Sequence, residues 1–153
     1  MIFDRDGTIV HDVPYNGEPD AVRPVSGVRE KLDALRAAGV PLAVVSNQSG
    51  VARGMITAAQ VESVNRRVEE LLGPFDAWLY CPHGPDDGCN CRKPKPQLIL
   101  DAARALGVDV ACCLVIGDKQ SDQQAAESAG AHAIRIARAP EVLEAIDEVL
   151  AQL

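Results

Sequence analysis

Two carboxylates stand two residues apart near the start of the chain, in the sequence Asp4-Arg5-Asp6-Gly7-Thr8. Side chains at positions i and i+2 point to the same side of an extended strand, so Asp4 and Asp6 can converge on one point in space. Such a pair suits phosphoryl transfer, in which Asp4 takes the phosphoryl group as an acyl phosphate. Asp6 would then protonate the leaving alkoxide and later activate water.

A third carboxylate, Asp118, follows an apolar run and a glycine. Mg²⁺ prefers a few carboxylates together with water and phosphate oxygens. We therefore expect a magnesium site formed by Asp4, the backbone carbonyl of Asp6, and Asp118. The alternative for Asp118 is the N-cap of the next helix, but Ser121 suits that position better.

Further segments carry groups suited to phosphate oxygens. Polar side chains follow a second apolar run: Ser46, Asn47, Gln48 and Ser49. A hydroxyl with backbone N–H groups at a strand-to-helix turn can bind a phosphate. Lys93 adds the fixed positive charge that a transferring phosphoryl group needs, and Arg92 reaches another part of the substrate. Lys119 either orients the Asp4 carboxylate or contacts the substrate. The alternative is an ordinary polar turn with solvated basic residues.

Three cysteines and one histidine fall within eleven residues: Cys81, His83, Cys89 and Cys91. This set predicts a closed tetrahedral zinc site, which organises a loop and leaves no open coordination position for water. A disulfide would leave an odd thiol and would not use His83. The other two cysteines, Cys112 and Cys113, lie in an apolar run and are expected in the core.

The composition limits the possible functions. A chain of 153 residues is the length of one ordinary domain, so we expect a single domain over residues 1–153. The formal charge of −7 argues against nonspecific nucleic-acid binding. There is no apolar run long enough for a membrane span and no signal-peptide pattern, so we expect a cytoplasmic protein. The expected partner is a small phosphorylated metabolite, with no nucleic acid and no membrane, and the chain is expected to act as a monomer.

Strands and helices alternate in the hydrophobic pattern. Strands are expected at 2–3, 40–45, 75–80, 112–116 and 132–136. Helices are expected at 26–38 with Ser26 as the N-cap, and at 57–73, 98–106, 121–130 and 140–150. Residues 9–25 and 81–96 are expected to be irregular loops. This alternation predicts an α/β fold with a parallel sheet covered by helices on both faces.

The expected strands place the polar groups on one rim of the sheet. Ligands of such sheets bind beyond the carboxyl ends of the strands, and Asp4, Ser46, Cys81 and Asp118 each stand at such an end. Only three residues precede Asp4, whereas strands typically run about 5–6 residues. So short a first strand suggests an amino terminus that is clipped, misassigned or incomplete.

Together these segments resemble the haloacid dehalogenase phosphatase superfamily over nearly the whole chain. The matching motifs, in the family's order, are Asp4-Arg5-Asp6-Gly7-Thr8, Ser46-Asn47-Gln48-Ser49-Gly50, Cys91-Arg92-Lys93-Pro94 and Gly117-Asp118-Lys119-x-x-Asp122. The resemblance implies a Rossmann-like sheet with the Asp4 strand at its centre, Mg²⁺ dependence and a phosphoaspartyl intermediate on Asp4. It also implies substrate contacts from the loop after Thr8, from residues 46–49, and from Arg92, Lys93 and Lys119. The intervals between motifs are already filled by expected elements, which indicates that there is no cap domain.

The cysteine-rich loop resembles that of the small, uncapped branch that acts on heptose bisphosphates or histidinol phosphate. Asp12-Val13-Pro14-Tyr15 and Val51-Ala52-Arg53-Gly54 resemble segments of the heptose enzymes. This likeness favours D-glycero-D-manno-heptose 1,7-bisphosphate, with removal of the 7-phosphate and with Asp12 and Tyr15 in contact with the substrate. The short interval from His83 to Cys89 is known on the histidinol-phosphate side, so that substrate stays an alternative.

Two other classes of protein fit the sequence less well than a phosphatase does. A receiver-type signalling domain also phosphorylates an aspartate on a parallel α/β fold, but it needs that aspartate at the end of the third strand, where Tyr80-Cys81 stands. A noncatalytic, zinc-stabilised binding module would not need the set of Asp4, Asp6, Lys93 and Asp118.

Overall fold

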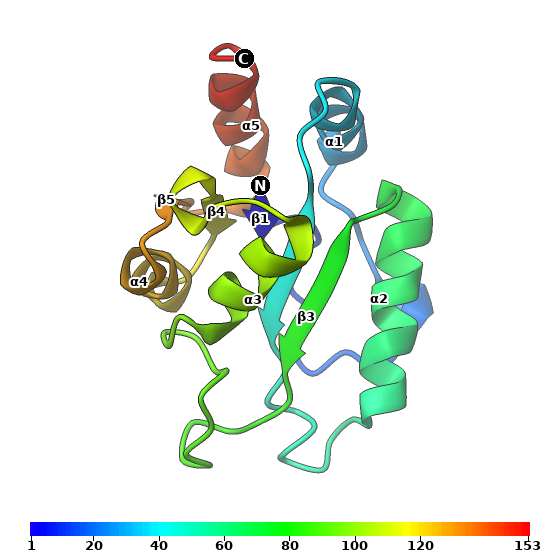
Figure 1. Cartoon of the computed structure of the whole chain (residues 1–153). Coiled ribbons are helices and arrows are strands. Elements are labelled where there is room, and N and C mark those ends of the chain that lie inside the picture. The colour runs from blue at the N-terminus through cyan, green and yellow to red at the C-terminus, as the bar shows by residue number, and fades with distance from the viewer.

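The computed structural model describes residues 1–153 as a five-stranded parallel sheet in the order β3-β2-β1-β4-β5, with helices on both faces (Figure 1). The strands are β1 (Ile2–Phe3), β2 (Ala43–Asn47), β3 (Ala77–Cys81), β4 (Leu114–Gly117) and β5 (His132–Arg135). The helices are α1 (Val28–Ala37), α2 (Ala58–Leu72), α3 (Gln97–Leu106), α4 (Gln120–Ala129) and α5 (Val142–Leu150). Short 3₁₀ helices form at η1 (Pro19–Ala21), η2 (Val110–Cys112) and η3 (Ala139–Glu141). The expected α/β fold is confirmed, and no cap is inserted above the sheet.

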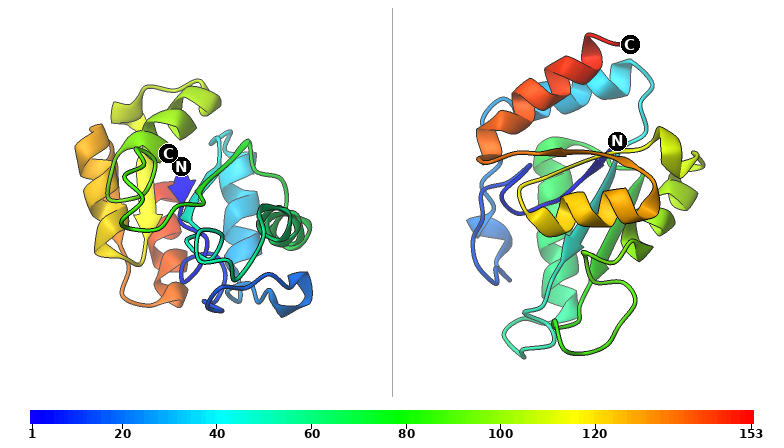
Figure 2. Two further views of the ribbon diagram at one scale, coloured as in Figure 1. Left: turned by 90° about the horizontal axis from the view of Figure 1, so that it is seen from below. Right: turned by 90° about the vertical axis from the view of Figure 1, so that its left-hand side faces the viewer.

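Two apolar layers hold the helices against the sheet, because successive side chains of a strand point to opposite faces. Phe3 and Val44 belong to the core beneath α1, α2 and α5, while their neighbours Ile2 and Ala43 belong to the core beneath α3 and α4. Figure 2 shows α1 and α5 running together over one face of the sheet. None of the helices has both the length and the apolar character needed to cross a membrane.

β1 is the shortest strand and lies at the centre of the sheet, as the resemblance implied. Ile2 and Phe3 pair with β2 on one side and with β4 on the other. The N–H of Asp4 extends the second ladder by donating to the carbonyl of Ile116 at 2.9 Å. Neighbouring strands therefore fix the backbone that carries the Asp4 side chain.

The order of the strands creates a crevice next to β1. The chain moves outward from β1 through β2 to β3, and then crosses to β4 and β5 on the other side. In doubly wound sheets, ligands bind where the strand order reverses, beyond the carboxyl ends of the strands. Asp4 follows β1 and Asp118 follows β4, so the two carboxylates flank this reversal.

Two element boundaries on the α1 side differ from the expected ones. The N-cap of α1 is Gly27 and not Ser26; its φ of 84° is a left-handed conformation that glycine adopts without a Cβ clash. β2 begins three residues later than expected. Pro41 has no N–H to give to a sheet, and the N–H of Leu42 donates to the carboxylate of Asp76 at 2.8 Å.

Two further expectations fail on the β4 side. α4 begins at Gln120, and the N–H of its N-cap residue, Lys119, donates to the carboxylate of Asp122 at 3.0 Å. The N-cap is therefore Lys119 and not the expected Ser121. Cys112 lies in the exposed turn η2, so its expected place in the core is wrong, whereas Cys113 is buried.

Candidate active site

Three carboxylates meet in the crevice between β1 and β4. Oxygens of Asp4, Asp118 and Asp122 lie within 4.8 Å of one another. Asp122 stands in the first turn of α4, four residues after Asp118, so the connection from β4 into α4 supplies both groups. Asp122 was not among the expected site residues. The signal for it was its fixed spacing from Asp118 within the fourth motif.

The buried ammonium group of Lys93 lies between two of these acids. Its Nζ is 2.8 Å from Asp4 Oδ1 and 2.6 Å from Asp122 Oδ1, and it donates to the Val45 carbonyl at 3.1 Å. Burial opposes the charged form, but the carboxylates of Asp4 and Asp122 outweigh burial and raise the pKa of Lys93. Lys93, and not Lys119, is therefore the lysine that holds Asp4.

The surroundings of Asp4 place it near the midpoint of its titration at neutral pH. Burial raises the pKa of Asp4 to about 7; Lys93 acts against this shift and Asp122 adds to it. Three carboxylates and one ammonium group together carry two net negative charges when all are ionised. A divalent cation would balance this charge inside a poorly solvated crevice.

Asp118 is the member of the cluster with a free oxygen. Its Oδ1 is buried and has no hydrogen-bond partner, and burial raises the pKa of this carboxyl group. Gly7 makes room for it, since a Cβ at position 7 would lie 2.5 Å from Asp118 Oδ2. Hard oxygen donors, excess negative charge and one unpartnered oxygen fit Mg²⁺.

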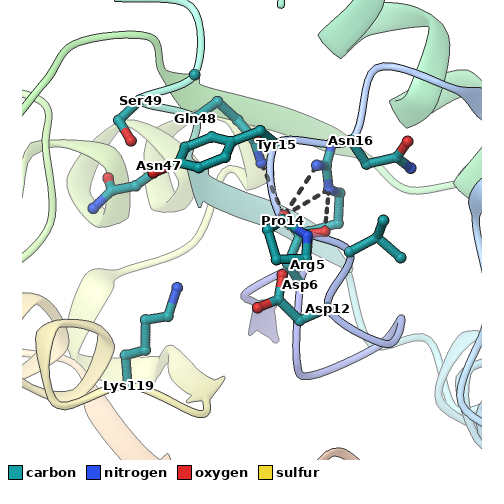
Figure 3. Close-up of a pocket in the computed structure, with 12 residues that line it drawn as sticks. Arg5, Asp6, Asp12, Pro14, Tyr15, Asn16, Asn47, Gln48, Ser49 and Lys119 are labelled. Carbon is teal, nitrogen blue, oxygen red and sulfur yellow. Dashed lines mark hydrogen bonds and ion pairs between the residues drawn. The ribbon is translucent and has the colours of Figure 1, made fainter. Parts of the chain in front are cut away.

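The second acid of the first motif has different partners from Asp4. The carboxylate of Asp6 accepts hydrogen bonds from the guanidinium group of Arg5 and from Gln48 Nε2 (Figure 3). Its side chain is outside the three-carboxylate cluster. The expected magnesium contact from the Asp6 backbone carbonyl remains a prediction.

Two adjoining cavities, of about 230 and 370 Å³, open beside these acids and share Asp6, Asn47, Ser49 and Lys119 as lining residues. The first cavity, shown in Figure 3, is also lined by Asp12, Tyr15 and Gln48. The second is also lined by Asp4, Arg92, Lys93 and Asp122. All expected substrate residues except Ser46 thus border one continuous region.

Ser46 does not line either cavity, but it is hydrogen-bonded to Gln48, which lines the first one. The Ser46 side chain is buried, and its Oγ accepts a hydrogen bond from Gln48 Nε2 at 3.2 Å. The same Nε2 donates to Asp6 at 3.0 Å. The side-chain amide nitrogen of Gln48 is therefore engaged by two protein groups, while Asn47 and Ser49 border both cavities.

Asn47 attaches the cysteine-rich loop to β2. Its Nδ2 donates to the Lys93 carbonyl, and its Oδ1 accepts from the Lys93 N–H, both at 3.0 Å. Both bonds are made to backbone groups, so they hold the chain at Lys93 whatever its side chain contacts. Arg92 is anchored beside it, because its guanidinium group donates to the His83 carbonyl at 3.2 Å.

The geometry of the four candidate zinc ligands fits a tetrahedron. Cys81 Sγ lies 3.7 Å from Cys89 Sγ, and His83 Nδ1 lies 3.5 Å from Cys81 Sγ and 3.4 Å from Cys91 Sγ. A tetrahedral ion with Zn–S bonds of about 2.3 Å and a Zn–N bond of about 2.0–2.1 Å would separate two sulfurs by about 3.8 Å, and a sulfur and a nitrogen by about 3.6 Å. The donors are therefore spaced for zinc.

The parallel sheet, the acids on its switch point and the lysine between them define a class of phosphoryl-transfer enzyme, and the chain belongs to the haloacid dehalogenase-like hydrolases. Residues 15–130 match the model of that family. The chain is 40% identical over 133 residues to the D-glycero-beta-D-manno-heptose-1,7-bisphosphate 7-phosphatase of Pseudomonas aeruginosa, covering 84% of this chain and 75% of that protein. It is 37% identical over 169 residues to the enzyme of that name in Escherichia coli K12, covering 100% and 88%.

The solved structures include a relative of nearly the same size. The D,D-heptose 1,7-bisphosphate phosphatase from B. bronchiseptica, complexed with magnesium and phosphate, has a TM-score of 0.92 and 30% identity, covering 100% of this chain and 98% of that one. A putative HAD-like phosphatase from Mesorhizobium loti has a TM-score of 0.76 and 31% identity, covering 97% and 85%. The family resemblance inferred from the four motifs is confirmed.

Proposed function

We propose that this chain is a Mg²⁺-dependent phosphatase that removes the 7-phosphate of D-glycero-D-manno-heptose 1,7-bisphosphate. The observation that carries the proposal is the cluster of Asp4, Lys93, Asp118 and Asp122 at the edge of a polar cavity. The heptose bisphosphate is favoured because relatives that align with most of this chain bear that name. The Cys81–Cys91 loop would hold a structural zinc ion.

The residues divide the chemistry between them. An oxygen of Asp4 attacks phosphorus, and the bond from phosphorus to the sugar oxygen breaks while Asp6 gives that oxygen a proton. Asp6 then takes a proton from water, which attacks the phosphoaspartate and releases inorganic phosphate and the Asp4 carboxylate. Lys93 holds Asp4 and places a positive charge beside the transferred group. Magnesium, held by Asp4 and Asp118 with the Asp6 carbonyl, would offset the phosphate charge when bound, while Asp122 keeps Lys93 in place.

The lining of the cavities suits a sugar that carries two phosphates. The first cavity presents hydrogen-bonding groups from Asp12, Tyr15, Asn47 and Ser49, which match hydroxyl groups. Arg92 and Lys119 add cations in the second cavity, next to the catalytic acids. These local charges are needed because the chain as a whole carries −7.

The proposal covers the chain as one catalytic domain over residues 1–153 that acts as a monomer in the cytoplasm. Its partner is the small phosphorylated sugar, with neither nucleic acid nor membrane. The metabolic role of the relatives supports the location, and the acidic charge supports the absence of nucleic acid.

Phosphate release from the two anomers of heptose 1,7-bisphosphate and from histidinol phosphate, with Mg²⁺ present, tests the proposal. We expect kcat/KM for one of the heptose bisphosphate anomers to be higher than kcat/KM for histidinol phosphate. Asp4→Asn should abolish turnover without changing the circular-dichroism spectrum, because an amide is not a nucleophile of comparable strength. Asp147→Asn, at an exposed position on α5, is the matched control and should retain activity. Turnover by Asp4→Asn would overturn the nucleophile assignment, and preference for histidinol phosphate would overturn the substrate.

A further inference from the structure

A buried arginine separates the two acids of the first motif and has no part in the chemistry described above. Only 1% of the Arg5 surface is exposed. A buried guanidinium group is costly unless its donors are paired. The partners of Arg5 therefore indicate why a cation is present at this position.

The guanidinium group of Arg5 divides its nitrogens between two partners. Nε and Nη2 donate to the Asp6 carboxylate at 3.0–3.2 Å, on the forked side of the group. The third nitrogen, Nη1, donates to Asn65 Oδ1 of α2 at 2.7 Å. Asn65 thus anchors the guanidinium group from behind, while its fork holds Asp6.

Packing alone does not hold Asp6 in place, since 21% of its side chain is exposed beside the cavity. Its carboxylate instead accepts hydrogen bonds from the guanidinium group of Arg5 on one side and from Gln48 Nε2 on the other (Figure 3). A forked guanidinium–carboxylate pair fixes the plane of the carboxylate as well as its distance. A lysine at this position would supply a point charge without that fork.

We propose that Arg5, anchored by Asn65, is a positioning residue that sets the orientation of the Asp6 carboxyl group toward the leaving oxygen. The inference rests on the proposed function, which makes Asp6 the general acid. Proton transfer requires the carboxyl oxygen to come within about 2.6–3.2 Å of the leaving oxygen. A free aspartate side chain rotates away from that geometry, and the Arg5 fork limits the rotation.

The leaving group separates this role from a merely structural one. As the phosphorus–oxygen bond breaks, an alkoxide must receive the proton of Asp6, whereas 4-nitrophenolate is stable enough to depart without it. A displaced Asp6 should therefore slow hydrolysis of an alkyl phosphate and leave hydrolysis of 4-nitrophenyl phosphate nearly unchanged. The parameter kcat/KM covers the steps through departure of the leaving group, so later hydrolysis of the phosphoaspartate does not enter it.

The experiment changes the anchor and not the arginine, because replacing buried Arg5 could prevent folding. Asn65→Leu removes the acceptor at nearly constant volume, and Asn65→Asp keeps an oxygen for Nη1. We expect Asn65→Leu to lower kcat/KM for heptose 1,7-bisphosphate by about tenfold, a part of the 10²–10⁴-fold that general acid–base catalysis contributes. For 4-nitrophenyl phosphate the change should stay under about twofold, and Asn65→Asp should restore the ratio of the two values.

The outcomes separate this inference from the proposed function. Equal losses on both substrates, or no loss in Asn65→Leu, would overturn the positioning role while leaving the phosphatase assignment intact. Loss in both Asn65 variants alike would also overturn it. If the unaltered protein releases phosphate from neither substrate, the proposed phosphatase function is wrong, and the positioning role that rests on it is wrong as well. Thermal denaturation of both variants checks that the fold is kept.

Discussion

At the scale of single residues, two identical side chains, Asp4 and Asp6, have different surroundings. Asp4 is buried against Lys93 and raised in pKa, whereas Asp6 is partly exposed and held by Arg5 and Gln48. A fixed position beside a cation favours attack by a nucleophile, whereas an acid–base group needs access to the leaving oxygen and to water. The two environments therefore support the proposed roles of Asp4 as nucleophile and Asp6 as general acid and base.

The raised pKa of Asp4 predicts pH-dependent magnesium binding. In the metal-free protein the acid form predominates below a pH of about 7 and the carboxylate predominates above it. Because Mg²⁺ binds the carboxylate, binding at lower pH must displace a proton. We expect the Mg²⁺ dissociation constant to rise about tenfold for each pH unit below about 7 and to level off above it. Isothermal titration of the protein with Mg²⁺, at pH values below and above about 7, measures the dissociation constant.

The Asp4→Asn variant is the control for this titration, since an amide has no proton to displace. Its weaker Mg²⁺ binding should depend less steeply on pH than that of the unaltered protein. Burial also raises the pKa of Asp118, so the remaining dependence should have the same sign. A dissociation constant that stays flat from about pH 5.5 to 8.5 would contradict the prediction.

At the scale of elements, the carboxyl ends of β2 and β3 connect the cysteine-rich loop to the three-carboxylate cluster. Asn47 and Cys81 are register partners at the end of the β2–β3 ladder, and the N–H of Gln48 donates to the Cys81 carbonyl at 2.7 Å. Asn47 then holds the backbone of Lys93. The loop between Cys81 and Lys93 is thus tied to the sheet at both ends, and zinc would order its middle.

Zinc removal should loosen the middle of this loop before it affects the magnesium site. We expect chelation to increase amide hydrogen exchange over residues 82–91, because a zinc ion would join the four donors across the loop. Exchange in α2 should stay unchanged, and Asn47 should keep Lys93 in place. Hydrogen exchange followed by mass spectrometry, before and after chelation, measures both segments.

A pair of serine variants provides the control for zinc. Cys89→Ser removes one of the four donors and should lower the zinc content of freshly purified, reduced protein well below one ion per chain. Cys112→Ser, at an exposed cysteine outside the cluster, should retain one ion. Absence of zinc from the unaltered protein would show that these four residues do not form a zinc site.

At the scale of the whole molecule, stability and chemistry lie in different parts of the fold. One core fixes α1, α2 and α5 to one face of the sheet, and the other fixes α3 and α4 to the opposite face. The acids and both cavities lie at the carboxyl ends of the strands, and no residue of α5 lines either cavity. Changes in α5 should therefore affect stability without changing the chemistry.

Ile146→Ala on α5 tests this separation. Ile146 is fully buried, and removing its side chain should lower the free energy of unfolding by about 2–5 kcal/mol through lost burial and the cavity left behind. The kcat at a temperature where the variant is folded should not change. Glu148→Ala, at an exposed position of the same helix, should stay within about 0.5 kcal/mol. Urea denaturation and steady-state kinetics measure the two effects, and an equal fall in kcat would refute the separation.

The sequence alone was sufficient for the order of the elements, the parallel sheet and the rim that collects Asp4, Ser46, Cys81 and Asp118. Apolar periodicity and the strand-end positions of polar residues carry this information locally. Boundaries were less predictable: α1 begins after a left-handed glycine, and α4 begins after Lys119, whose N–H donates to the carboxylate of Asp122. Both depend on how the backbone turns, which hydrophobic periodicity does not encode.

Only the tertiary structure decided which partner each charged group has. Lys93 is 89 residues from Asp4 in the chain, and Asn65 is 60 residues from Arg5. No local pattern links such pairs, because their contact depends on the order of the strands and on the face of the sheet that each helix covers. The sequence therefore supplied the chemical groups and the rim on which they stand, and the packing of the sheet and helices determined how they pair.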